Sequence, residues 1–271
     1  MPKLNQFILV FLLISMTSCS PMVENIVPTP GLTAAIKLTQ TSEPSPVPTQ
    51  GTTDSVQAAT PTQTLAAPTL PAPRSTRCSP LAEHSLAQLP EIVSQPYAPP
   101  PPGKDERHHG VDFAYYNHAG RAAIDGEGVQ AIMGGRVAAA IQDRLPYGNM
   151  VIIETPYESL PQEILESMQI AEENSVYHLY AHFAETSLVV LNQQVECGQL
   201  LGYVGQTGYV VPVAHLHLET RIGPPGVAFE SMAFFDTQAT PEEQAAYTRW
   251  RTSGDFQHID PMTLFAANQG Q

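Results

Sequence analysis

Basic residues are scarce in this chain, and their scarcity narrows the kinds of partner that it can have. The sequence of 271 residues holds 12 Lys and Arg against 26 Asp and Glu, which gives a formal net charge of −14. Proteins bind nucleic acid largely through Lys and Arg contacts to phosphates. The composition therefore argues against nucleic acid as a partner.

Long apolar runs are also missing. Residues 7–14 form an unbroken apolar run, but a helix needs about 20 such residues to span a bilayer. With Lys3 before it and small residues after it, the run predicts an export signal over residues 1–19. The run ends in Met-Thr-Ser-Cys, which resembles a bacterial lipobox, so Cys19 is expected to carry a lipid. We expect an exported, extracytoplasmic protein that is anchored to the membrane by this lipid. The alternative is an ordinary secreted protein with a chance cysteine.

Aromatic residues are absent from residues 20–77, where Pro, Thr and Ser dominate and the few charges nearly balance. Such a segment cannot bury enough apolar surface to offset the entropy of ordering it. We predict a disordered tether over residues 20–77. The remaining residues, 78–271, carry almost all of the net charge, and they suffice for one domain.

Cysteine is rare as well. Besides Cys19, only Cys78 and Cys197 are present. Outside the cytoplasm this pair can form a disulfide that would stabilise the domain. Alternatively, Cys197 is a small buried apolar residue. The sequence leaves both readings open.

Short β-like runs punctuated by glycine dominate residues 78–271. We expect strands at residues 111–115, 129–132, 136–141, 149–154, 176–183, 200–204 and 215–221. Gly134 and Gly135 predict a hairpin between the second and third of these runs. Helices are expected only at residues 160–173 and 241–251. The predicted fold is mainly β: an antiparallel sheet with an open groove and one or two short helical insertions.

Three histidine-bearing stretches stand out, at residues 107–112, 180–183 and 214–219. Imidazole and carboxylate ligands suit a tetrahedral Zn²⁺ that keeps one position open for water. The stretches form one site only if the fold brings them together.

The spacing of these residues predicts which way their side chains point. His215 and His217 lie two apart on a strand and should point the same way, with leucines on the opposite face. By the same rule, His182 should share a face with Tyr180 and His178. His108 and Asp112 lie four apart, about 13 Å on a straight strand, so a bend at Gly110 is needed to bring them together. His109 is expected to face outward as a neighbour.

Three further histidines, His84, His118 and His258, have no potential ligand at a spacing that is typical of a metal site. We interpret them as solvated or structural.

Together the three stretches resemble the lysostaphin/LytM-type zinc metallopeptidases, which are peptidoglycan endopeptidases. The resemblance runs over residues 107–219 and includes the glycine-containing segments 110–113, 128–137, 147–149 and 198–208. It implies one zinc ion per domain, with His108, Asp112 and His217 as its ligands. It also implies that His182 and His215 are catalytic without being ligands. The implied substrate is a peptide bond in the stems or cross-bridges of peptidoglycan.

The chain departs from this family in three places. Prolines at 99–102 lie where several relatives carry an active-site tyrosine, and residues 156–174 and 223–251 exceed a minimal family domain. The chain lacks an H-E-x-x-H helix, so no glutamate is placed beside the metal as a base. His182 and His215 remain as groups that can accept a proton near neutral pH.

Two other functions stay open. One is a non-catalytic LytM-like binding module that regulates cell-wall hydrolases, and the other is a zinc peptidase that acts on secreted proteins. The sequence does not determine the bond cleaved, the division of roles between His182 and His215, or the oligomeric state.

Overall fold

The computed structural model describes residues 76–209 and 211–266. The predicted export signal, Cys19 and nearly all of the predicted tether lie outside these residues. The helices and strands are η1 Leu89–Ile92, β1 Val93–Gln95, β2 Val111–Phe113, β3 Gly128–Gln130, β4 Gly135–Arg144, β5 Gly148–Thr155, η2 Tyr157–Ser159, α1 Gln162–Met168, β6 Ser175–Ala181, β7 Gln194–Val195, β8 Leu200–Tyr203, β9 Leu216–Gly223, α2 Pro241–Arg251, β10 Gln257–Ile259 and α3 Met262–Ala266. Among these residues, none of the helices is long and apolar enough to cross a membrane.

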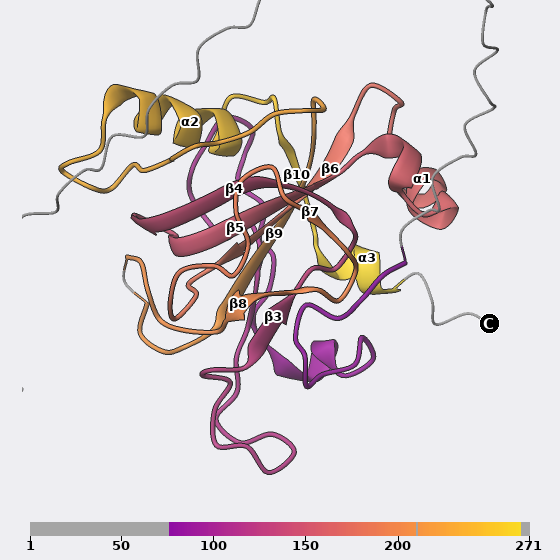
Figure 1. Ribbon diagram of the computed structural model, residues 1–271, viewed down its shortest axis with the longest axis vertical. Coiled ribbons are helices and arrows are strands. Elements are labelled where there is room, and N and C mark those ends of the chain that lie inside the picture. The colour runs from indigo at the N-terminus through magenta and orange to yellow at the C-terminus, as the bar shows by residue number, and fades with distance from the viewer. Residues whose placement is uncertain (1–75, 210, 267–271) are drawn as a thin grey trace, which may run out of the picture. The chain divides into compact units, whose positions relative to one another are not determined.

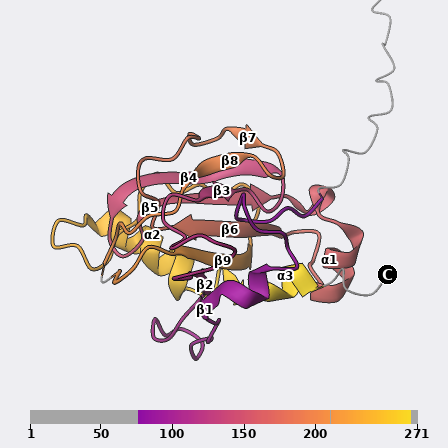
Figure 2. The same cartoon turned by 90° about the horizontal axis from the view of Figure 1, so that it is seen from below.

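The strands form one large antiparallel sheet and a small two-stranded ribbon. The large sheet has the order β1-β2-β9-β6-β5-β4-β7, and β10 pairs with the far part of β9. The ribbon consists of β3 and β8. In Figure 1 the ribbon lies on one side of the large sheet and α2 on the other. Figure 2 shows β3 and β8 at the height of β4, near the β7 end of the large sheet and far from its β1 end. The predicted fold class, mainly antiparallel β with few helices, is confirmed.

Each face of the large sheet has its own apolar core. On the ribbon side, Val111, Leu216 and Leu218 join residues from η1, α1 and α3. On the other side, Leu179 and Ala181 of β6 pack with Tyr247 and Trp250 of α2. Alternate residues of a strand point to opposite faces, so β2, β6 and β9 present side chains to both sides, although only β6 of these three contributes to both apolar cores. Asp112 and His217 occupy positions that face the α2 side.

The predicted helix 241–251 is confirmed as α2. Thr240 caps its first turn, with the Thr240 hydroxyl accepting from the Glu243 N–H and the Glu243 carboxylate accepting from the Thr240 N–H. The other predicted helix is shorter than expected, because α1 ends at Met168 and Gln169 adopts a left-handed conformation (φ 51°).

The predicted hairpin at Gly134 and Gly135 is wrong. β3 pairs with β8, and β4 pairs with β5 and β7. Residues 131–133 between β3 and β4 are fully or almost fully buried. They carry the chain from the ribbon to the large sheet, so the two strands lie in different layers and cannot pair.

Candidate metal and catalytic site

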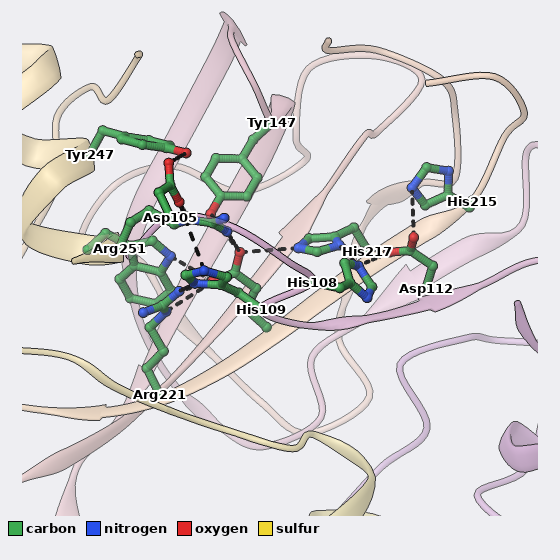
Figure 3. A network of polar contacts seen from close by, with 12 residues as sticks. Asp105, His108, His109, Asp112, Tyr147, His215, His217, Arg221, Tyr247 and Arg251 are labelled. Carbon is green, nitrogen blue, oxygen red and sulfur yellow. Dashed lines mark hydrogen bonds and ion pairs between the residues drawn. The ribbon is translucent and has the colours of Figure 1, made fainter. Parts of the chain in front are cut away.

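Two of the predicted ligands face each other across neighbouring strands. Asp112 of β2 is the antiparallel partner of His217 of β9. The Asp112 Oδ1 and His217 Nδ1 atoms are 2.7 Å apart. His108 Nε2 lies 3.0 Å from the same oxygen and 3.1 Å from His217 Nδ1. The fold therefore brings all three predicted ligand side chains to one point (Figure 3).

The chain before β2 delivers His108 to this point. Ala98 and His108 form a β-bridge, and the chain bends at His109 and Gly110 as the spacing predicted. Gly110 also lies so close to β9 that a Cβ atom there would come within 2.3 Å of the Leu218 carbonyl oxygen. A side chain at position 110 would therefore push the His108 segment away from β9.

The hydrogen bonds of the two imidazoles fix which nitrogen carries the proton. His108 Nδ1 is 3.0 Å from the Pro96 carbonyl oxygen, and His217 Nε2 is 3.2 Å from Glu219 Oε1. Both oxygens can only accept, so both nitrogens donate. The opposite nitrogens, His108 Nε2 and His217 Nδ1, then present lone pairs toward each other and toward the Asp112 carboxylate.

Three acceptors that converge in this way need a positive charge between them. Hydrogen bonds with His108 and His217 outweigh the opposing effect of burial and hold the pKa of Asp112 well below its usual range. Burial lowers the pKa of His217, but the carboxylates of Asp112 and Glu219 outweigh it and raise the pKa to about 9. In the absence of a cation, a proton satisfies the cluster. The donor set, two imidazoles and one carboxylate, fits Zn²⁺.

His182 and His215 lie beside the ligand cluster, with ring centroids 4.7 Å apart. The His182 ring is 5.8 Å from that of His217, and His215 Nε2 is 3.7 Å from Asp112 Oδ2. His182 Nδ1 donates to the Thr207 carbonyl (2.7 Å) and His215 Nδ1 donates to the Val213 carbonyl (3.0 Å). Each ring therefore keeps its Nε2 atom as a proton acceptor. Burial, together with the neighbouring histidines, lowers the pKa of His182 to about 3.

The predicted common face of His178, Tyr180 and His182 is wrong. β6 ends at Ala181, and His182 adopts a left-handed conformation (φ 67°), which breaks the alternation of the strand. Tyr180 belongs to the core on the ribbon side, and the fully buried His178 contacts Thr220 Oγ1 at 3.2 Å. His182 instead turns toward the ligand cluster on the α2 side.

The expectation that His109 faces outward is also wrong. His109 is fully buried, and its Nδ1 accepts from Arg221 Nη2 at 2.8 Å. Burial is the main cause that lowers the pKa of His109 to about 3, so the ring is neutral. The bend at residues 109–110 turns the ring inward.

A buried carboxylate behind His217 was not predicted. Glu219 is fully buried, and besides His217 it accepts hydrogen bonds from Tyr147, Arg221, Trp250 and Arg251. The arginines outweigh burial and hold the pKa of Glu219 well below its usual range. Residues two apart on a strand share a face, so its position two residues after His217 could have predicted their contact. No pattern in the sequence indicated that Arg221 and Arg251 contact Glu219.

The cluster opens into a cavity of about 490 Å³ that is lined by His108, Asp112, His182, His215 and His217 among others. The tyrosines that line it come from other parts of the chain than the proline-rich stretch at 99–102. They are Tyr147, Tyr209 and Tyr247.

The remaining histidines, and Cys78 and Cys197, lie outside this cavity. His84 is buried against Glu127 (2.7 Å), His258 Nδ1 contacts the Tyr97 hydroxyl (2.5 Å), and His118 packs against His84 with ring centroids 5.1 Å apart. All three have structural contacts. Cys78 and Cys197, for which the sequence left two readings open, form a disulfide.

Comparison with known proteins gives one family. Residues 160–228 match the family model of Peptidase family M23. The matched segment contains His182, His215 and His217, whereas His108 and Asp112 precede it. No curated protein matches the chain.

Three solved structures illustrate the similarity. The catalytic domain of the prophage-encoded M23 protein EnpA from Enterococcus faecalis, as its A109H mutant, is 20% identical, with 51% of this chain and 85% of that chain covered and a TM-score of 0.35. The catalytic domain of the antimicrobial peptidase lysostaphin from Staphylococcus simulans is 25% identical, with 52% and 87% covered and a TM-score of 0.35. A zinc containing peptidase from Vibrio cholerae is 20% identical, with 48% and 33% covered and a TM-score of 0.33.

Proposed function

Proceeding from the match of residues 160–228 to Peptidase family M23, we propose that this chain is a zinc-dependent endopeptidase. Its substrates are peptide bonds in the stems or cross-bridges of peptidoglycan, and its role is cell-wall remodelling. The observation that carries the proposal is the convergence of His108 Nε2, His217 Nδ1 and the Asp112 carboxylate within 3.1 Å of one another beside two further histidines.

His108, Asp112 and His217 are the residues that would hold the zinc ion. A bound ion would supply Lewis acidity toward the scissile carbonyl and toward a water molecule, whose pKa it would lower toward neutrality. The chain supplies the proton acceptors. His182 and His215 line the cavity with their Nδ1–H groups tied to backbone carbonyls, so that each Nε2 can take a proton from the attacking water or, once protonated, donate to the developing oxyanion.

Two measurements test this function. The purified protein should contain one zinc ion, and mass spectrometry of digested peptidoglycan fragments should show new peptide termini. Stoichiometric zinc with cleavage of secreted proteins but not of peptidoglycan would contradict the substrate and favour the secreted-protein peptidase. Zinc without hydrolysis of any peptide would favour the binding module.

We also propose that residues 1–19 direct export, that Cys19 carries a lipid anchor, and that residues 20–77 tether the domain 78–271 above the membrane. The support is the apolar run that ends at Cys19 and the composition of the following segment. Cys19→Ser should move the protein to the soluble exported fraction or leave its signal unprocessed. An unmodified Cys19 in the mass spectrum of the mature protein would contradict the anchor.

A further inference from the structure

One side chain of α2 connects the two chain segments that carry the proposed ligands. Arg251 Nε donates to Asp105 Oδ1 at 2.6 Å, and Arg251 Nη1 donates to Glu219 Oε1 at 2.8 Å. Asp105 lies three residues before His108, and Glu219 lies two residues after His217. Figure 3 shows Arg251 next to Asp105.

On the β9 side, the contact reaches a ligand directly. Glu219 Oε1 accepts from both Arg251 Nη1 and His217 Nε2. The other carboxylate oxygen accepts from Trp250 Nε1 (3.0 Å) and from Arg221 Nη2 (2.7 Å). Because Glu219 is held in place and ionised, it fixes the tautomer and the orientation of the His217 ring.

On the Asp105 side, the contact with Arg251 orders the segment that precedes β2. Asp105 Oδ2 accepts from the Tyr247 hydroxyl (2.7 Å), and Asp105 Oδ1 lies 3.9 Å from His109 Nε2. That nitrogen has no hydrogen-bond partner among the described residues. Arg221 holds the other nitrogen of His109. Two arginines therefore tie the segment around His108 to β9.

The charges in this network balance. Glu219 and Asp105 carry two negative charges, and Arg221 and Arg251 carry two positive charges. Removing Arg251 would leave the partly exposed Asp105 without its arginine and the buried Glu219 with Arg221 in place of two arginines, which is unfavourable. Arginine suits the position because its planar group donates in several fixed directions and can serve two carboxylates at once, which a lysine nitrogen does less well.

We propose that Arg251 is a positioning residue of the metal site, which holds His108 and His217 at ligand distance by bridging Asp105 and Glu219. The inference rests on the proposed function in taking His108, Asp112 and His217 as the zinc ligands. Helix α2 follows the segment matched to the family, and the inference gives this helix a function in the metal site.

The test is the zinc dissociation constant of the full-length protein, measured with a competing chelator. Arg251→Met should weaken zinc binding by about 10- to 100-fold, the usual effect of losing an outer contact to a metal ligand. Arg251→Lys should fall between this variant and the wild type. Arg249→Met is the matched control, because Arg249 lies on the same helix but is nearly half exposed and pairs with Asp255. Its dissociation constant should stay at the wild-type value.

A second readout separates positioning from simple stabilisation. In protein substituted with Co²⁺, the visible absorption spectrum should change in Arg251→Met and stay unchanged in Arg249→Met. Unfolding is measured in parallel in the presence of chelator. If Arg251→Met lowers the stability of the metal-free protein but leaves the dissociation constant and the spectrum unchanged, the inference is overturned.

A further variant covers the case in which Arg251→Met does not fold. Asp105→Asn keeps the shape of a side chain that is one-quarter exposed and removes its charge. Weaker zinc binding in Asp105→Asn supports the inference, and unchanged binding overturns it. If the wild type binds no zinc at all, the proposed function fails, whereas a wild type that binds zinc with all variants unchanged overturns only the role of Arg251.

Discussion

The two halves of the candidate site are held in place by different means. The proposed ligand half contains Asp112 and His217, which sit on paired strands, with His217 backed by the buried Glu219. It also contains His108, whose ring is oriented by the Pro96 carbonyl. The catalytic half, His182 and His215, lies just beyond the end of β6 and just before the start of β9, where single backbone carbonyls orient the rings. The ligand half should therefore respond to changes of side-chain charge, and the catalytic half to changes of backbone geometry.

The largest effect is expected in the ligand half. His108→Ala, Asp112→Ala and His217→Ala each remove one of three groups that converge on one point, so each should abolish stoichiometric zinc binding and peptidase activity together. The measurement is the zinc content of each variant by mass spectrometry, after equilibration with a moderate concentration of chelator. Retention of one zinc per chain in all three variants would place the site elsewhere.

The catalytic half should behave in the opposite way. His182→Ala and His215→Ala each remove a proton acceptor or an oxyanion donor, so turnover should fall by roughly 10²–10⁴-fold while zinc stays bound. Cleavage of cross-linked peptidoglycan peptides at equal zinc occupancy is the measurement. His118→Ala, which lies outside the cavity, should keep wild-type turnover. Near wild-type rates in both of the first two variants would refute the proposed roles.

A backbone change should damage only the catalytic half. Gly208 has φ 108°, and a Cβ atom there would lie 2.4 Å from the Pro146 carbonyl oxygen and 3.0 Å from His182 Nδ1. Gly208→Ala should displace Thr207, whose carbonyl orients His182, and lower turnover by up to about 10²-fold. The zinc dissociation constant should not change. A loss of zinc equal to the loss of turnover would contradict the separation of the two halves.

The smallest effect concerns His178, on the opposite face of β6. Burial lowers its pKa to about 3 in the folded protein, whereas an unfolded histidine titrates near pH 6.5. Below pH 6.5 the unfolded state binds the extra proton, so this residue makes stability fall as the pH falls toward 3, by about 1.4 kcal/mol per pH unit.

His178→Leu should remove this contribution. Denaturant unfolding between pH 7 and pH 4.5 should show a shallower pH dependence for the variant than for the wild type, and turnover near neutral pH should be unaffected. Equal slopes would mean that His178 is not buried as a neutral ring.

The two halves also differ in how far the sequence predicts them. Alternation along β9 and the residue before it places His215 and His217 together and Leu216 and Leu218 opposite, because a strand has a fixed period. Alternation fails at His182, since one residue in a left-handed conformation reverses the face. It indicates the face of Glu219 but not its contacts with Arg251 or the bridge from Arg251 to Asp105, because these residues belong to distant segments that share no period.

The same contrast holds for the fold. Helix α2 could be predicted to the residue because its cap and its first proline act locally. The pairing of β3 with β8 could not be predicted, because the two strands are far apart in sequence and pair only when the layers of the fold assemble. Short elements such as β7, β10 and α3 carry too few residues to show a period.

The register of β2 against β9 has a consequence for how the protein reaches its native state. Because Asp112 and His217 are direct partners across two strands, a slip of one residue would turn every side chain of β2 to the other face. A chain with that error would lack a complete ligand set. Zinc, which would bind only the correctly paired form, would shift the folding equilibrium toward it. The ion proposed to serve the chemistry would thus also select against misaligned strands.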